Sequence, residues 1–272
     1  MTPKPDFLII GAMKAGTTTL YRDLEHHPQL FLPPEKEPDT LVRFGDDMAA
    51  IEADYASLFG GALGGQLRGE ASTSYTKRPD HEGVAERAFR LCGEGLKLIF
   101  LARDPVNRAV SHYRHDFGLG YVEEPLSEAL RAYPHYAAYS AYEWQLASWR
   151  ERFGPDRLLL LDFEDYVENR SATLERVCSF LEIDPARLAD PKEDRAFNSS
   201  EGKPVAKGLV LTFVTSRFYQ RRLKPLVPWG LRDWFMHRFL PKAGTVREKI
   251  DPQTETDLRQ RIAQFEELAD GG

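Results

Sequence analysis

A lysine, two glycines and three threonines lie close together near the start of the chain, in the sequence DFLIIGAMKAGTTTL over residues 6–20. Gly11 and Gly16 permit positive φ angles and a close approach of the backbone to a ligand. Lys14 adds a positive charge, and the hydroxyls after Gly16 can donate hydrogen bonds. A helix that begins there adds free N–H groups and its dipole. The sequence therefore predicts an anion site, which comprises Ala12, Met13, Lys14, Ala15, Gly16, Thr17, Thr18 and Thr19.

The position of the lysine separates this loop from the nucleotide-triphosphate loop. That loop has the pattern G-x-x-x-x-G-K-[ST], in which the lysine follows the second glycine. Here Thr17 follows Gly16, and Lys14 comes before Gly16. The order K-x-G-T-T resembles the 5′-phosphosulfate loop of sulfotransferases that use 3′-phosphoadenosine-5′-phosphosulfate (PAPS). A second motif is needed to favour a sulfotransferase over other anion-binding proteins.

A second set of phosphate-binding residue types follows farther along the chain. Residues 103–113, RDPVNRAVSHY, resemble the R-D-P-x-x-R-x-x-S-x-[YW] site for the 3′-phosphate in the same family. A guanidinium can bind a phosphate through two hydrogen bonds, and a hydroxyl can add a donor. The resemblance assigns these roles to Arg103 and Ser111. The alternatives are an ion pair of Arg103 with Asp104 or another acid, and a place on the helix surface for Arg108.

A proline-rich loop after the first predicted helix contains the candidate bases. Prolines break the chain repeatedly over residues 28–38. Related sulfotransferases carry K-E-P-H-F-F or E-x-H-F-F here, and the glutamate is their catalytic base. This chain keeps Lys36-Glu37-Pro38 but continues with Asp-Thr-Leu. The resemblance therefore makes Glu37 the expected base and Asp39 its rival, against the alternative of a solvated loop.

Two further groups are candidates for contact with ligands. Family members close over the nucleotide with a basic loop at the place of residues 192–208, so Lys203 and Lys207 are candidates for the 3′-phosphate or the adenine. The alternative is an ordinary surface loop. Aromatic residues over 117–149 either pack helices onto the sheet or line an acceptor pocket, since aromatic walls suit organic ligands. The pocket candidates are Tyr133, Tyr136 and Tyr139.

The sequence gives little indication of a metal site. His112 and His115 have a spacing that suits a metal, but no third ligand is evident near them in the sequence. Asp162, at the end of an apolar run, resembles the metal-holding aspartate of a triphosphatase. Sulfuryl transfer needs no metal, because the moving group has less charge to neutralise than a phosphoryl group. We therefore predict no metal.

Apolar runs that predict buried parallel strands come before both phosphate motifs, at residues 6–10 and 96–102, and again at 157–163. Residues 67–74 read as a short strand that runs into a turn. The predicted helices are 17–27, 47–59, 81–92, 105–117, 126–131, 138–153, 164–182 and 252–269. In open α/β sheets ligands bind at the carboxyl ends of the strands, where both motifs lie. We predict an α/β fold with a central parallel sheet flanked by helices; the resemblance implies a P-loop-like sulfotransferase fold.

Length and charge limit the organisation of the chain. Its 272 residues suit a single domain, with a nucleotide-binding core at about 6–182 and a helical, basic and aromatic C-terminal part at about 209–272. The net charge of −6 does not indicate nucleic-acid binding. Basic and aromatic residues over 215–243 allow contact with a membrane surface, an acidic acceptor or another subunit; the alternative is a set of amphipathic helices that cover the sheet. No feature indicates an oligomeric state.

The sequence also bears on the compartment. The two cysteines, Cys92 and Cys178, have no metal-ligand spacing and fit buried thiols in a reducing compartment. No signal sequence fits the first residues, and no apolar run approaches the length of a membrane span. We expect a cytoplasmic, bacterial enzyme.

The resemblance implies transfer of a sulfuryl group from PAPS to a hydroxyl or amine of an organic acceptor, with 3′-phosphoadenosine-5′-phosphate (PAP) as product. The expected acceptor is a small-molecule metabolite or a glycan or glycolipid. One alternative is a metal-dependent P-loop kinase or NTPase with Asp162 on Mg²⁺, although no lysine follows Gly16. The other is a non-catalytic nucleotide-binding module, which the replacement of H-F-F after Pro38 leaves open.

Overall fold

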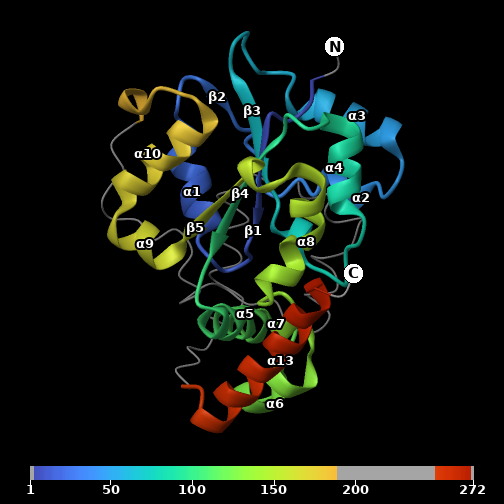
Figure 1. Cartoon of the computed structure of the whole chain (residues 1–272), viewed down its shortest axis with the longest axis vertical. Coiled ribbons are helices and arrows are strands. Elements are labelled where there is room, and N and C mark those ends of the chain that lie inside the picture. The colour runs from blue at the N-terminus through green and yellow to red at the C-terminus, as the bar shows by residue number, and fades with distance from the viewer. Residues whose placement is uncertain (1–2, 189–248, 271–272) are drawn as a thin grey trace, which may run out of the picture.

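The computed structural model describes residues 3–188 and 249–270. Five parallel strands form one sheet in the order β2-β3-β1-β4-β5, with helices on both faces (Figure 1). The strands are β1 (Phe7–Gly11), β2 (Leu30–Phe31), β3 (Leu67–Ala71), β4 (Lys97–Ala102) and β5 (Leu158–Asp162). This confirms the predicted α/β fold with a central parallel sheet.

The burial of the strands follows their place in the sheet. Strand β1 is buried along its whole length, because β3 and β4 flank it and helices cover both faces. Strand β5 lies at an edge, and Leu160 on it is 42% exposed. The edge strand β2 was not predicted, since two residues between prolines are too short to show alternation.

The helices agree with the predicted set, apart from two divisions and the short helix α2, which was not predicted. They are α1 (Thr17–Leu24), α2 (Thr40–Arg43), α3 (Met48–Leu58), α4 (Val84–Cys92), α5 (Pro105–Leu119), α6 (Leu126–Ala132), α7 (His135–Ala138), α8 (Tyr142–Phe153), α9 (Phe163–Glu168), α10 (Arg170–Leu181) and α13 (Pro252–Asp270). The single helix predicted over 164–182 is wrong, because Asn169, with φ −125°, interrupts it. The helix predicted over 138–153 begins only at Tyr142, after the separate turn α7.

The helices form three groups around the sheet. Figure 1 shows α1, α9 and α10 on one side of the sheet and α3, α4 and α8 on the other. Helices α5, α6, α7 and α13 lie together beyond the carboxyl ends of the strands. This last group has its own hydrophobic core, which includes Tyr113, Tyr136, Trp144, Leu258 and Ile262. The protein thus has a main core around the sheet and a second core at the edge where both motifs were expected.

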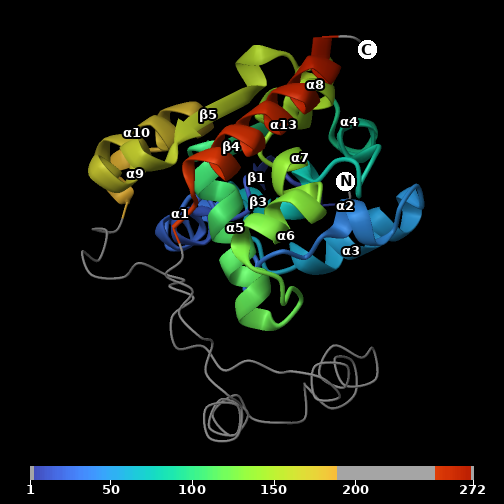
Figure 2. The same cartoon turned by 90° about the horizontal axis from the view of Figure 1, so that it is seen from below.

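The C-terminal helix returns to the rest of the chain. Helix α13 confirms the helix predicted over 252–269, and it packs against α7 and α8, as Figure 2 shows. Lys203, Lys207 and the basic aromatic segment 215–243 lie outside the described residues, and the division into a core and a helical C-terminal part stays a prediction. Among residues 3–188 and 249–270, no helix is both long and apolar enough to cross a membrane.

Candidate functional site

The loop predicted to bind an anion connects β1 to α1. Its last residue, Gly16, is the N-cap of α1 with φ 88°, and a Cβ atom there would lie 2.8 Å from the ring of Phe163. Only glycine fits both the positive φ and the close contact. No side chain caps α1, so the first N–H groups of the helix, at Thr17 and Thr18, point out of its N-terminus without a side-chain acceptor. The loop therefore has the geometry of an anion site.

Arg103 connects the second motif to this loop. It follows β4, and its Nη1 donates a 3.2 Å hydrogen bond to the carbonyl oxygen of Lys14. The guanidinium lies 4.8 Å from the ring centroid of Phe163, the same ring that contacts Gly16. The Nε atom is buried and has no hydrogen-bond partner in the described part of the chain. The structure thus brings together two motifs that are far apart in sequence and leaves a buried donor beside the loop.

Asp104, considered above as an ion-pair partner of Arg103, contacts other residues. Asp104 caps α5 by accepting a 2.8 Å hydrogen bond from the N–H of Asn107, and its other oxygen lies 3.5 Å from Nη2 of Arg259. The backbone of Arg103 is fixed separately, because the hydroxyl of Tyr142 donates to its carbonyl oxygen at 2.8 Å. Asp104 therefore positions the helix, and the guanidinium of Arg103 turns to the loop.

Ser111 and Arg108 lie farther along α5. Ser111 is half-buried, about 9 Å along the helix from its first residue. Arg108 is fully buried and donates to the hydroxyl of Ser140 at 2.6 Å and to the carbonyl of Tyr136 at 2.9 Å. The surface position considered for Arg108 is therefore wrong; the residue ties α5 to the segment around α7.

The loop with the candidate bases is fixed to the sheet. The N–H of Glu37 donates to the carbonyl of Ala71 at the end of β3, at 2.9 Å. One carboxylate oxygen of Glu37 accepts hydrogen bonds from Lys36 at 2.8 Å and from the hydroxyl of Thr73 at 3.1 Å. Burial alone would raise the pKa of Glu37, but the charges of Lys36 and Lys77 and the Thr73 hydrogen bond lower it below 4.5 overall. Glu37 is thus held as a carboxylate.

Asp39 occupies a different position in the same loop. Its carboxylate accepts a hydrogen bond from the hydroxyl of Ser74, and its N–H donates to Ser72 Oγ at 3.1 Å. Its backbone begins α2, with φ 54°. Both candidate bases therefore contact the 3₁₀ turn after β3, and the carboxylate of Asp39 is already hydrogen-bonded there.

Lys77 is a site residue that the sequence did not indicate. It follows the 3₁₀ turn η1 (Thr73–Thr76) and lies outside every motif used above. Burial lowers the pKa of Lys77, while the carboxylates of Glu37 and Asp39 act in the opposite direction. A half-buried cation therefore lies within electrostatic range of both candidate bases.

Glu70 supports this region from inside the core. It is fully buried on β3, and three hydroxyls donate to it: Tyr55 at 3.0 Å, Tyr75 at 2.5 Å and Ser72 at 2.8 Å. Burial raises the pKa of Glu70 to about 7, against the effect of these donors. The network joins α3, β3 and η1, and it holds Ser72, the residue that the backbone of Asp39 contacts.

The three tyrosines predicted to line an acceptor pocket all donate to carboxylates. Tyr133 bonds Glu124 at 3.0 Å, Tyr136 bonds Asp116 at 2.9 Å, and Tyr139 bonds Asp80. Tyr136 and Tyr139 are buried, which agrees with the packing alternative. Their part in an acceptor pocket stays a prediction.

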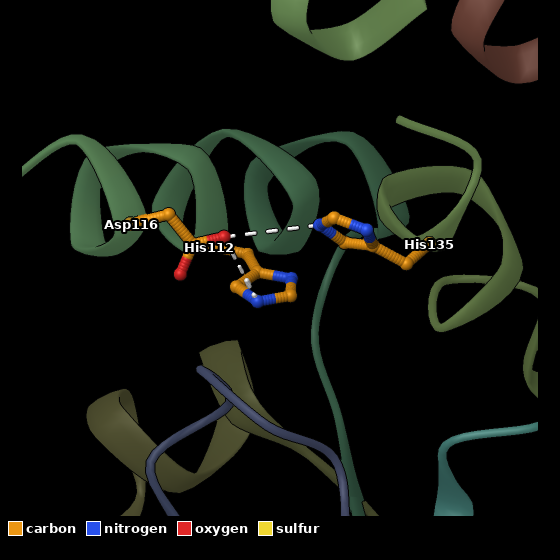
Figure 3. A group of neighbouring side chains, drawn as sticks. All are labelled: His112, Asp116 and His135. Atoms are coloured by element: carbon orange, nitrogen blue, oxygen red, sulfur yellow. Dashed lines mark ion pairs between the residues drawn. The ribbon is translucent and has the colours of Figure 1, made fainter. Parts of the chain in front are cut away.

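His112 has neighbours that its sequence context did not show. Asp116, one turn farther along α5, and His135, at the start of α7, lie beside it (Figure 3). His115, the partner considered for a metal, is not part of this group. His135 was missed because it lies on another helix, α7. Burial lowers the pKa of His112 well below its usual value, and Arg108, His135 and Lys77 act in the same direction.

A cavity of about 430 Å³ lies elsewhere in the molecule. Lys4, Asp6, Leu96 and Lys97 line it, at the amino ends of β1 and β4. Both phosphate motifs follow the carboxyl ends of the same strands, where open α/β sheets bind ligands. The motifs therefore mark the candidate site better than this cavity does.

Comparison with known proteins identifies a family. The model of the sulfotransferase domain matches residues 4–222. Carbohydrate sulfotransferase 15 of Mus musculus is 27% identical over 66% of this chain and 44% of its own length. The crystal structure of a sulfotransferase from Alicyclobacillus acidocaldarius covers 71% of this chain and 86% of its own, with 26% identity and a TM-score of 0.62. Mouse sulfotransferase SULT7A1, solved with PAP, shares the fold at 16% identity, with a TM-score of 0.51 over 96% of this chain and 84% of its own. This chain spans less than two thirds of the length of the curated relatives that it matches first.

Proposed function

Because this chain belongs to the sulfotransferase family, we propose that it transfers a sulfuryl group from PAPS to a hydroxyl or amine of an organic acceptor and releases PAP. The observation that carries the proposal is the hydrogen bond from Arg103 to the carbonyl of Lys14. This hydrogen bond joins the two motifs into one binding region. The residue types of one motif suit the 5′-phosphosulfate of PAPS, and those of the other suit its 3′-phosphate. The buried Nε of Arg103, which has no hydrogen-bond partner among the described residues, could donate to a phosphate.

Different residues at this edge of the sheet would bind the two ends of PAPS. Lys14 and the N–H groups of Thr17 and Thr18 would hold the 5′-phosphosulfate end, at the positive end of the α1 dipole. Arg103 and Ser111 would hold the 3′-phosphate. Lys203 and Lys207, outside the described residues, are proposed to close over the nucleotide.

Glu37 is the proposed general base. As the new bond between acceptor oxygen and sulfur forms, its carboxylate would take the acceptor proton. Lys14 and the loop N–H groups would stabilise the charge that develops on the leaving phosphate oxygen. Glu37 is favoured over Asp39 because its side chain is 44% exposed and accessible to an acceptor, whereas Asp39 is half-buried. When bound, PAPS supplies the activated sulfuryl group.

The two alternatives have less support. A kinase or NTPase would need Asp162 for Mg²⁺, but Asp162 caps α9 by accepting from the N–H of Asp165 at 2.8 Å. A non-catalytic module would not need a carboxylate that Lys36 and Thr73 hold charged and partly exposed beside the donor site. Sulfuryl transfer uses both the charged carboxylate of Glu37 and the donor site.

The acceptor is proposed at the level of chemical class. The name of the mouse carbohydrate sulfotransferase is consistent with a saccharide, and the aromatic residues around Tyr133 suit a small organic molecule. A cytoplasmic location stays a prediction. Screening saccharides and small alcohols and phenols with labelled PAPS would identify the acceptor.

Calorimetric titration with PAP and with 5′-AMP tests the donor assignment. We expect PAP to bind more tightly than AMP, and Arg103→Ala to weaken PAP by about 10- to 100-fold and far more than it weakens AMP, because only PAP has the 3′-phosphate. Arg152→Ala, which removes a surface arginine paired with Glu86, is the control and should leave both affinities unchanged. Equal affinities of the wild-type protein for PAP and AMP would refute the donor assignment.

A further inference from the structure

Two imidazoles and a carboxylate converge in the second core. His112 and Asp116 are four residues apart on α5 and therefore share one face of the helix. His135, the first residue of α7, faces the same carboxylate from a neighbouring segment (Figure 3). One ligand atom from each residue lies within 4.8 Å of the others.

The distances in this cluster suit ligands of one metal ion. Nε2 of His112 is 3.3 Å and Nε2 of His135 is 3.8 Å from the same oxygen of Asp116. Both exceed the usual N–H···O range of about 2.7–3.2 Å. Nitrogen and oxygen ligands bound tetrahedrally at about 2.0–2.1 Å lie about 3.3 Å apart. His112 and Asp116 already have this separation, and His135 would have to move toward them to complete the geometry.

Burial and neighbouring hydrogen bonds hold the cluster in place. The side chains of His112 and Asp116 are 7% and 12% exposed, whereas His135 is 29% exposed and leaves a path from solvent. Tyr136 donates at 2.9 Å to the oxygen of Asp116 that faces both imidazoles, and such hydrogen bonds commonly orient a carboxylate that binds a metal.

We propose that His112, Asp116 and His135 form a binding site for a divalent transition metal ion, with Zn²⁺ as the best fit. Two imidazoles and one carboxylate are a ligand set of catalytic zinc sites, in which the fourth position stays open for water or another oxygen. The two imidazole ligands disfavour Mg²⁺ and Ca²⁺, which prefer oxygen ligands, relative to a metal that bonds to imidazole nitrogen.

Lys77 connects the site to the proposed base electrostatically, because the charges of Asp116 and of Glu37 both act on it. A bound metal would therefore act on the same lysine as the proposed base. Tyr136, considered for the acceptor, donates to the carboxylate ligand Asp116. The proposal nevertheless stands independently of sulfuryl transfer, because metal binding needs neither PAPS nor an acceptor.

The test is a titration of the full, tag-free chain with Zn²⁺ after treatment with a chelator, with competition by a chromophoric chelator to measure Kd. We expect one equivalent of Zn²⁺ to bind, with no displacement by millimolar Mg²⁺ or Ca²⁺. His135→Ala and Asp116→Asn should each weaken this binding by at least about 100-fold, since each removes a ligand. His115→Ala, on the same helix but outside the cluster, should leave Kd within about threefold of the wild-type value.

PAP titrations of the same variants separate this proposal from the proposed function. His135→Ala is partly exposed and Asp116→Asn keeps the shape of the side chain, so both should bind PAP as the wild-type protein does. Wild-type protein without a one-equivalent Zn²⁺ site, or unchanged Zn²⁺ affinity in both variants, would overturn the metal site. Neither result would affect the assignment of PAPS as donor.

Discussion

The protonation of Glu37 is set by the residues that contact it. The charges of Lys36 and Lys77 and the Thr73 hydrogen bond outweigh burial and lower the pKa of Glu37 below 4.5. A base acts in its ionised form, so activity should be full above this pKa and be lost as the pH falls through it. Lys36→Gln removes one cation and should move the acid limb of the kcat/KM profile to higher pH. Lys4→Gln, far from the site, should leave the limb in place.

Glu37→Gln tests the role of the same residue directly. The amide cannot take a proton, so the rate of sulfuryl transfer should fall by at least about 100-fold. The affinity for PAP should not change, because Glu37 is assigned to the acceptor. Turnover is measured with labelled PAPS and a saturating acceptor. A variant that turns over at the wild-type rate would show that the base lies elsewhere, with Asp39 as the first residue to examine.

Glu70 should make stability depend on pH. Its pKa is raised from 4.5 to about 7 in the folded protein, so the folded state favours the protonated carboxyl. The stability that this carboxyl contributes is fully present below pH 4.5 and is lost as the pH rises to about 7. The stability of Glu70→Gln relative to wild type should therefore increase over this interval, by a maximum of about 3 kcal/mol. Urea midpoints measured at several pH values check this; a constant difference between the two proteins would contradict it.

At the scale of elements, short sequence patterns predicted the strands and helices that depend mainly on local sequence. Strands β1, β4 and β5 were found because each is an apolar run between turn signals, and α5 because a proline follows Asp104, its N-cap. Strand β2 forms through pairing with β3, which no short window of sequence can show. The positions of Lys77 and His135 depend in the same way on contacts between distant segments. The motif residues of the site were therefore predictable, and its other charged and imidazole groups were not.

The turn before α1 should tolerate only glycine at its last position. Gly16→Ala places a Cβ atom 2.8 Å from Phe163 at φ 88°, so either the loop or the Phe163 ring, on which Arg103 lies, must shift. We expect a loss of stability of at least about 1 kcal/mol and PAP binding weakened by at least about 10-fold. Gly65→Ala is a matched control, since it has φ 87° with nothing within 4 Å of the added Cβ atom. It should lose stability through backbone strain while PAP affinity is retained; an equal loss of PAP affinity in both variants would contradict the role of the loop.

At the scale of the whole molecule, the end of the chain supports the edge of the sheet that carries the motifs. Arg131 on α6 donates to Thr254 on α13 at 3.1 Å, and Phe265 stacks on Trp144 of α8 with ring centroids 5.1 Å apart. The second core that α13 completes contains Tyr136, whose carbonyl oxygen accepts from Arg108. Residues far beyond the motifs in sequence thus fix the helix that presents Ser111.

The two cores should unfold together, because α8 contributes Trp149 to the main core and Trp144 to the second core, and its Tyr142 fixes the backbone of Arg103. Leu258→Ala removes a side chain that is 1% exposed on α13, and we expect it to lower the free energy of unfolding by about 2–5 kcal/mol. Leu268→Ala, on the same helix but 57% exposed, should change it by less than about 0.5 kcal/mol. Urea unfolding followed by circular dichroism and by loss of PAP binding should give one midpoint for both signals, shifted down only in Leu258→Ala. If PAP binding persisted through a first transition that Leu258→Ala shifts, the second core would be an independent unit, and its support of the donor site would be refuted.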